Sequence, residues 1–231
     1  MPGPSRLTPP HAAAALLAMA GAVTLVPAHA ADATFTDKAA FLAATPGLSL
    51  ESFETLAGSD RALVPIVTPG MTLLPGTAGI GVQTGPTTPL DGFGATATDG
   101  THYVSVYALN AAPGTLTFKL ARPATAFGFT ITDAGEVAGF IRLGTNAGSH
   151  VSGVDVYSFG AGQGNAQQYF LGLTQDQAFT QVTLTLNGFD EAYGVDAVYT
   201  NAVPEPGTAW SLAAGLAGLG LLLRRRQHAA S

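Results

Sequence analysis

The sequence predicts an all-β protein: an antiparallel β-sandwich or jelly roll with one short N-terminal helix. Short segments with apolar residues at every second position recur over roughly the second half of the chain, separated by Gly, Asn, Asp or Pro. No helical pattern of about ten or more residues lies between them, which disfavours a parallel α/β sheet. There is no cysteine, so a hydrophobic core rather than disulfides has to stabilise the fold.

The first 30 residues have the pattern of a secretory signal peptide. A basic start precedes an apolar run over residues 12–26, and Ala28 and Ala30 form a small-residue cleavage site. We therefore expect residues 1–30 to be removed on export. A retained transmembrane helix is the less favoured alternative, because the run is rich in alanine and a cleavage site follows it.

Residues 31–202 are expected to form one β-sandwich domain. Its helix is predicted over residues 36–44, because Thr36 can cap it and Asp37 lies in the first turn, where the helix dipole favours an acid. Apolar alternation and turn residues predict the strands. The predicted strands are residues 48–53, 62–67, 71–74, 101–107, 114–120, 126–131, 137–143, 151–159, 168–173, 179–186 and 195–200.

The exported part of the chain is acidic. Up to Glu205 it contains all 15 Asp and Glu residues and only five bases, which gives a net charge of about −10. A protein that binds phosphate groups needs a basic face, so nucleic acid is excluded as a partner and anionic membrane surfaces are disfavoured. The five bases are Lys38, Arg61, Lys119, Arg122 and Arg142.

The C-terminal segment, residues 203–228, has three consecutive parts. It begins with Val203, Pro204, Glu205, Pro206 and Gly207, in which the two prolines favour an extended backbone. Residues 209–223 carry no charge and are expected to form a short hydrophobic transmembrane helix. The triplet Arg224, Arg225 and Arg226 then stays cytoplasmic by the positive-inside rule, which places the rest of the chain outside the inner membrane.

This order of Pro-Glu-Pro, hydrophobic span and arginine cluster resembles the PEP-CTERM sorting signal of Gram-negative bacteria. The resemblance implies recognition and cleavage by an exosortase, a membrane-embedded enzyme of bacteria that make exopolysaccharide and biofilm. It also implies a membrane-anchored precursor that ends in the cell envelope or outside the cell. The alternative is an ordinary C-terminal anchor with a proline-rich stalk.

A calcium site is predicted near the C-terminal end of the domain. Asn187, Asp190, Glu191 and Asp196 offer hard oxygen ligands on one loop and strand start. Glu51 and Glu54 can approach them if the first and last strands pair. A solvated acidic loop whose Asn and Asp residues form turns is the competing interpretation.

Residues 168–199 resemble the closing strands of domains often found ahead of PEP-CTERM signals. They are also similar to the last strand of jelly-roll carbohydrate-binding modules, in which an acid just before a Val-rich strand helps to hold a structural calcium. The resemblance implies a carbohydrate-binding module as the alternative function, and exopolysaccharide as a ligand. The sequence departs from the pattern at Ala197, where such modules have a second acid. Aromatic residues on strands are the candidate sugar-stacking groups: Tyr103, Tyr107, Phe140, Tyr157, Tyr169 and Phe170.

No catalytic motif is found, and we do not expect an enzyme. Residues 31–202 contain only two histidines, His102 and His150, and each stands alone in the sequence. There is no Gly-x-Ser-x-Gly elbow and no His-rich metal motif. The prediction is therefore an exported, exosortase-processed structural or adhesive protein.

Overall fold

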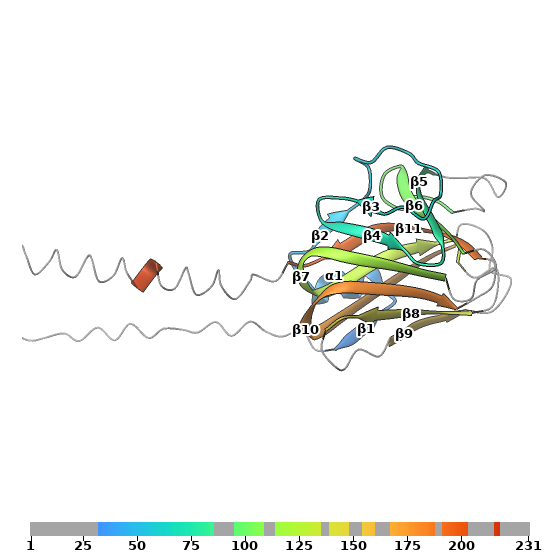
Figure 1. The fold of residues 1–231 in the computed structure, drawn as a ribbon. Coiled ribbons are helices and arrows are strands. Elements are labelled where there is room, and N and C mark those ends of the chain that lie inside the picture. The colour runs from blue at the N-terminus through green and yellow to red at the C-terminus, as the bar shows by residue number, and fades with distance from the viewer. Residues whose placement is uncertain are drawn as a thin grey trace, which may run out of the picture.

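The structure is a computed structural model that describes residues 32–85, 95–108, 114–134, 139–147, 154–159, 167–187, 191–202 and 215–217. Nearly all of its regular structure is β-strand (Figure 1). The elements are β1 (Ala33–Phe35), α1 (Lys38–Ala44), β2 (Ser49–Glu51), β3 (Ile66–Val67), β4 (Met71–Pro75), β5 (Gly79–Thr84), β6 (His102–Ala108), β7 (Gly114–Thr132), β8 (Gly139–Thr145), β9 (Val154–Phe159), β10 (Gln168–Asn187) and β11 (Glu191–Thr200).

The strands β7 and β10 organise the fold because each is long and takes part in two layers. The first half of β7 pairs with the second half of β10, from Gly114 with Leu186 to Lys119 with Gln181. The second half of β7 pairs with the first half of β10, from Ala126 with Thr174 to Thr132 with Gln168. Register shifts separate the two halves. The long antiparallel pair is therefore bent in the middle, as a strand that passes from one sheet of a sandwich to the other requires.

Each half of the pair recruits its own neighbours. One layer, which we call the covered layer, contains β5, β6, β11, the second half of β7 and the first half of β10, with β1 and β2 attached. The other, the open layer, contains β3, β4, the first half of β7, the second half of β10, β8 and β9. Every pairing is antiparallel.

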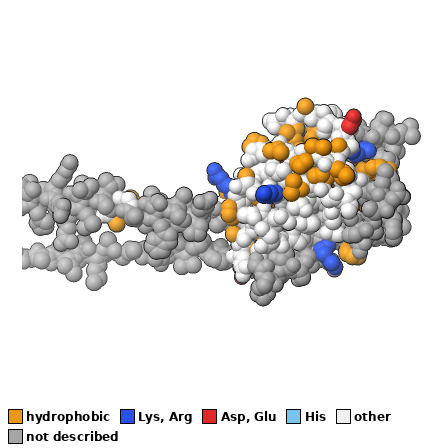
Figure 2. Space-filling view, in the orientation of Figure 1, with side chains coloured by type: hydrophobic (Ala, Val, Ile, Leu, Met, Phe, Trp, Pro, Cys, Tyr) orange, Lys and Arg blue, Asp and Glu red, His pale blue; other side chains and the backbone are white. Residues whose placement is uncertain are grey.

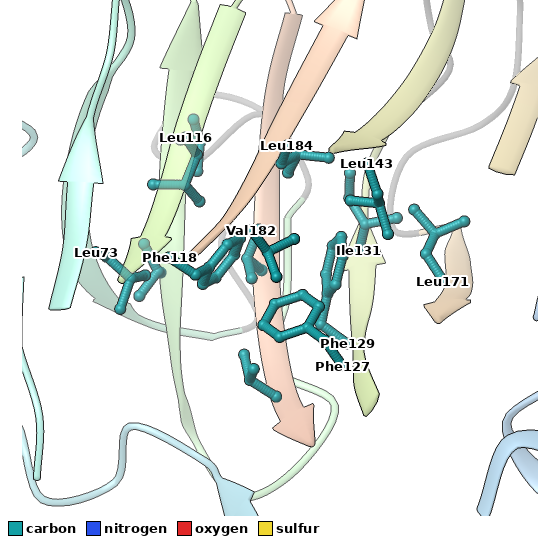
Figure 3. Packing of buried hydrophobic residues seen from close by; sticks show 14 of the residues in the cluster. Leu73, Leu116, Phe118, Phe127, Phe129, Ile131, Leu143, Leu171, Val182 and Leu184 are labelled. Carbon is teal, nitrogen blue, oxygen red and sulfur yellow. The ribbon is translucent and has the colours of Figure 1, made fainter. Parts of the chain in front are cut away.

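The core lies between the two layers. On the open layer, buried and half-exposed residues alternate along β7, and Leu116 and Phe118 are fully buried. On the covered layer, Phe127, Phe129 and Ile131 are also fully buried, and Phe127 packs against Phe118 with ring centroids 5.0 Å apart. Figure 3 shows these side chains pointing toward one another. The period-2 alternation read from the sequence thus builds one continuous core.

The helix α1 and a loop cover the outer side of the covered layer. Phe41 of α1 is fully buried against Ala126 and Phe170, in a small cluster separate from the main core. It approaches Gly128 and Gly172 so closely that a Cβ at either position would lie 2.9 Å from its ring. The loop 95–101 hydrogen-bonds the same layer, as when Thr96 N–H donates to Thr132 Oγ1 over 3.2 Å.

The outer side of the open layer carries polar and charged side chains instead. Thr115, Thr117, Thr183 and Thr185 are half-buried on neighbouring strands, and Lys119 is exposed beside them. Figure 2 looks onto this face: its lower part is white with scattered blue cations, and an orange apolar patch lies across its upper part. The sandwich therefore presents one uncovered sheet face to its surroundings.

The all-β antiparallel prediction is confirmed, with three corrections of detail. Asp37 rather than Thr36 caps α1, and its carboxylate accepts a hydrogen bond from Ala40 N–H at 2.7 Å. The strands predicted over residues 114–120 and 126–131 are one strand, β7, and those over 168–173 and 179–186 are one strand, β10. Two strands were not predicted: β1 pairs with β10, and β5 pairs with β6.

The predicted signal peptide, with Ala28 and Ala30, lies outside the described residues. So does the predicted C-terminal hydrophobic helix, apart from residues 215–217, which are helical and exposed. Among the described residues, no helix has the length and apolar character needed to cross a membrane.

Candidate functional site

The C-terminal segment leaves the folded domain after β11. A hydrogen-bonded side chain just after β11 anchors this end of the domain to the sandwich. Asn201 follows β11 directly, and its Oδ1 accepts hydrogen bonds from Thr125 N–H at 2.9 Å and Ala126 N–H at 2.8 Å. Its Nδ2 donates to Thr125 Oγ1 at 2.8 Å. These bonds satisfy backbone donors at the bend of β7, so the last described residues before the C-terminal segment are held against the sandwich.

A groove with a volume of about 290 Å³ opens beside this exit. The bend of β7 and the turn between β3 and β4 form one part of its lining, and Ser49 and the residues after β11 form another. Arg122 is the only charged side chain among the lining residues. The lining consists of Ser49, Pro69, Gly70, Leu120, Ala121, Arg122, Thr200, Asn201 and Ala202.

Of the predicted acidic residues, Glu51 and Asp196 lie on strands of the covered layer, and Asp196 is fully buried there. Its Oδ2 accepts hydrogen bonds from Thr98 N–H at 2.5 Å, Thr98 Oγ1–H at 3.0 Å and Asp99 N–H at 2.8 Å. Burial raises the pKa of this carboxyl group, and the hydrogen bonds from Thr98, Asp99 and Ala197 oppose the rise. A buried carboxylate thus holds the loop before β6 through the backbone.

The same loop is held a second time by Glu54. Its Oε1 accepts from Thr101 N–H at 2.7 Å and from His102 N–H at 2.5 Å, while Oε2 accepts from Thr101 Oγ1–H at 3.0 Å. These bonds, that from His102 N–H above all, lower the pKa of Glu54 from its ordinary value of 4.5 to about 2. His102 Nδ1 lies 3.3 Å from Oε2 and forms an ion pair when it is protonated.

Gly100 lies between the residues held by Asp196, 98–99, and those held by Glu54, 101–102. It has φ +75°, and a Cβ on it would lie 2.4 Å from Glu54 Cδ. The left-handed turn therefore lets two successive N–H groups point at each carboxylate, a geometry that binds anionic oxygens well. We call Glu54, Asp196 and the loop 98–102 that they hold the carboxylate latch. Its evident role is to fix the loop over the covered layer.

The calcium ligands predicted from the sequence are only partly brought together. The strands β2 and β11 do pair, with Glu51 opposite Val198, as the prediction required. Glu51 Oε1 accepts from Phe53 N–H at 2.9 Å, and Glu54 and Asp196 hold the latch. Asn187 ends β10, but its side chain and Asp190 lie outside the described residues. Within the part of the chain that the structure describes, no three acidic or histidine side chains form a metal-binding group.

The predicted sugar-stacking aromatics separate into two groups. Tyr103 and Phe170 are buried, which corrects their assignment as exposed stacking residues. Phe170 lies in the cluster under α1, and Tyr103 lies on the outer side of the covered layer, which the loop 95–101 covers. Tyr107, Phe140 and Tyr169 are half-buried, and the Arg142 guanidinium carbon lies 5.4 Å from the Phe140 ring centroid. The side chain of Tyr157 lies outside the description.

Comparison with known families gives one match. Residues 202–226 match the family model described as the PEP-CTERM protein-sorting motif. The match begins at Ala202, the last described residue of the domain, and includes the predicted motif Val203 to Gly207 and the triplet Arg224 to Arg226, which lie outside the described residues. No curated protein sequence matches the chain.

Solved structures show only distant likeness. A cleaved adhesin domain of Lys-gingipain has a TM-score of 0.45 at 11% identity, covering 67% of this chain and 99% of that one. A family 29 carbohydrate-binding module from Piromyces equi has a TM-score of 0.39 at 9% identity, covering 67% and 91%. The TmCBM61 module in complex with β-1,4-galactotriose has a TM-score of 0.37 at 14% identity, covering 54% and 82%. Because these TM-scores are below 0.5, the description of the fold relies on the strand pairing of this chain and not on these structures.

The sequence alone revealed the sorting motif. It did not reveal the residues at the end of the domain, Asn201 and Arg122, that lie where the motif begins. Asn201 and Arg122 carry no motif, and Asn201 acquires its partners only when the bend of β7 comes beside it. The Asp99-Gly100 pair is a recognisable turn signal. That signal does not reveal the carboxylates of Glu54 and Asp196, which come from distant parts of the chain.

Proposed function

We propose that this protein is an exported, exosortase-processed component of the cell envelope or extracellular matrix of a Gram-negative bacterium, with a structural or adhesive role. The observation that carries the proposal is the sorting motif at residues 202–226, since this signal implies exosortase-dependent export from a membrane-anchored precursor. The role in exopolysaccharide or biofilm follows from the cellular context that such signals imply. No catalytic step is part of the proposal.

The geometry of the exit supports this function. Asn201 ties the end of the domain to β7, so the sandwich is complete before the motif begins. Cleavage beyond Ala202 would then leave every strand and buried core residue that the structure describes in place. A folded domain that is unaffected by the cut is what a protein released from its anchor needs.

The test uses substitutions within the motif in the native host. We expect the double substitution Pro204→Ala and Glu205→Ala to leave the chain full-length in the inner membrane, while wild-type chains are shortened and reach the envelope or the medium. Thr208→Ser is the matched control, because it lies in the same segment outside Pro-Glu-Pro, and it should be processed like the wild type. Equal processing of the motif variant, or of wild-type chains in a host without exosortase, would refute the proposal.

A second function, carbohydrate binding, is favoured by the open face. Four threonines on β7 and β10 form a polar grid there, with Thr117 Oγ1 3.3 Å from Thr183 Oγ1. Phe140 beside Arg142 adds an apolar ring at the edge of the same layer. Binding of exopolysaccharide by this face should weaken in Phe140→Ala and persist in Tyr169→Phe. Flat calorimetric titrations of the wild type against a panel of acidic and neutral polysaccharides would remove this candidate.

Calcium is the cofactor that this second function would use. The proposed ligands are Asn187, Asp190 and Asp196, with Glu51 or Glu54 nearby, and the ion would stabilise the end of the domain. The thermal unfolding midpoint should then be higher in millimolar calcium than in chelator, and Asp190→Asn should abolish the difference. An identical midpoint in the two buffers excludes the ion.

A further inference from the structure

The end of the domain from which the C-terminal segment leaves has a distinct surface, which we call the exit pole. It consists of the groove beside Asn201, the exposed residues Leu50, Val67 and Lys119 that lie close to its lining in the chain, and the half-buried Lys38 over Tyr199. Leu50 pairs with Tyr199 near the end of β11, and the Lys38 ammonium lies 5.0 Å from the Tyr199 ring centroid. Val67 precedes the turn that lines the groove.

The sequence limits how far this pole can be from the membrane. Only six residues, 203–208, separate Ala202 from the start of the uncharged segment at Ala209. Fully extended, they span at most about 20 Å, at ~3.4 Å for each residue. The polar zone on each side of the hydrocarbon core is itself roughly 5–8 Å thick. While the C-terminal segment is in the membrane, the exit pole is therefore confined to the lipid surface.

The chemistry of the pole suits such a surface. Leu50 is 47% exposed and Val67 is 65% exposed, and large apolar side chains at these exposures can enter the boundary between headgroups and acyl chains. Three of the five bases of the domain, Lys38, Lys119 and Arg122, lie on or beside the same pole. Figure 2 shows blue cations and orange apolar groups together at the left end of the domain. Bases beside exposed apolar groups are the usual combination of proteins that bind anionic lipid.

The acids near the pole limit the strength of this contact. Asp37 and Glu51 lie on the adjoining elements, but each carboxylate accepts a hydrogen bond from a backbone N–H group. Asp32 and Asp176 lie together where β1 meets the bend of β10. With a domain net charge of about −10, contact with an anionic bilayer is weak for a free domain. A short tether raises the effective concentration of the domain at the lipid surface into the millimolar range or above, so a weak contact is enough for docking.

We propose that the exit pole docks on the anionic lipid surface of the inner membrane while the chain is anchored, and that cleavage of the tether releases it. Docking holds the Pro-Glu-Pro segment at the membrane surface, where a membrane-embedded protease acts. After the cut, the tether no longer opposes the repulsion between the acidic domain and the anionic lipid, and the domain leaves. This inference rests on the proposed function, because it requires the C-terminal segment to lie in the membrane.

The test places the full chain in lipid nanodiscs and exploits its lack of cysteine. A single Cys introduced by Val67→Cys carries a fluorophore, and nitroxide-labelled phospholipid in the disc quenches it on contact. Gln168→Cys is the matched control, since Gln168 is exposed and lies at the end of β10 far from the bend. We expect strong quenching at position 67 and little at position 168 in discs with phosphatidylglycerol.

Charge variants separate docking from simple proximity. Replacing Lys38, Lys119 and Arg122 by Gln should weaken the contact about fivefold for each base at low salt, since each is worth about 1 kcal/mol. The double variant Arg61→Gln and Arg142→Gln, which changes bases away from the pole, should retain the quenching. When residues 203–208 are replaced by a site-specific protease sequence of equal length, cutting it should release the domain from the discs.

Two failures are distinguishable. If the chain does not float with the discs, the C-terminal segment does not insert and the proposed function fails with it. If the chain floats but quenching is equal at positions 67 and 168, or unchanged in the triple Gln variant, docking alone is overturned.

Discussion

At the scale of single residues, two of the carboxylates predicted as metal ligands, Glu54 and Asp196, bind backbone N–H groups of one loop. Glu54 and Asp196 each receive two successive N–H groups, and Gly100 makes the turn between the two sets. Carboxylates that accept several backbone bonds order a loop strongly, because the bonds are charge-assisted. The latch therefore gives the acidic residues a structural purpose independent of calcium.

The Glu54 part of the latch should make the protein sensitive to acid. The pKa of Glu54 is lower in the folded state, about 2, than its ordinary value of 4.5. Its contribution to stability is therefore fully present above about pH 4.5 and is lost as the pH falls toward 2. Glu54→Gln should lower the unfolding midpoint at pH 7 and flatten its decline between these values. Denaturation followed by circular dichroism checks this, with the exposed Asp60→Asn as control; an unchanged acid limb would contradict it.

Gly100 gives a second prediction at this scale. Gly100→Ala combines a left-handed backbone, which costs about 1 kcal/mol for alanine, with a Cβ pressed against Glu54. Gly47 also has a positive φ, of +79°, but a Cβ there meets nothing within 4 Å. Gly47→Ala thus measures backbone strain alone. Urea denaturation should show a larger loss of stability for Gly100→Ala; equal losses would mean that Glu54 moves aside freely.

Predictions about single residues succeeded where the residues that define a feature are adjacent in the sequence. The sorting motif is a run of neighbouring residues, so it could be read directly, and residues 202–226 match the family model. The partners of the latch are separated by 47 and 98 positions, and no local pattern encodes them. For the same reason, burial of Tyr103 and Phe170 was missed, since strand alternation does not say which face a helix or loop will cover.

At the scale of elements, α1 packs onto the sheet through two glycines. Gly172→Ala would place a Cβ 2.9 Å from the Phe41 ring and 3.1 Å from Phe170, and overpacking of this kind costs about 1–3 kcal/mol. Gly70→Ala introduces a Cβ with nothing within 4 Å and should be nearly neutral. Chemical denaturation of the two variants compares them. If Gly172→Ala is as stable as Gly70→Ala, α1 does not pack tightly on the covered layer.

The existence of most strands could be predicted, but their continuity could not. Pro123 was taken as a strand boundary because proline cannot donate to a ladder. In the structure it lies at the bend of β7, where the pairing changes from β4 to β11, and no ladder bond is required of it. The division of β10 failed similarly, since Gln175 to Ala178 form its bend. Polar and proline residues mark bends in long strands as well as their ends.

At the scale of the whole molecule, the β-sandwich is a complete folded unit, and the C-terminal segment that follows it carries the sorting motif. Asn201, just after β11, is hydrogen-bonded to the bend of β7, and the sorting motif begins at the next residue, Ala202. The bases and exposed apolar residues of the exit pole lie at the end of the domain from which the C-terminal segment leaves, as the docking proposal requires. The net charge could be read from composition, but this uneven distribution could not, because Lys38 is distant in sequence from Lys119 and Arg122 and comes to the same end of the domain only in the folded chain.

The measurement that tests the central claim most directly is the intact mass of the protein recovered from its native host, fraction by fraction. The account predicts a chain that begins near Ala31, ends within or just after Val203 to Gly207, and occurs in the envelope or extracellular matrix. A chain that still contains residues 209–226 and stays in the inner membrane would contradict it, and would make the C-terminal segment a permanent anchor.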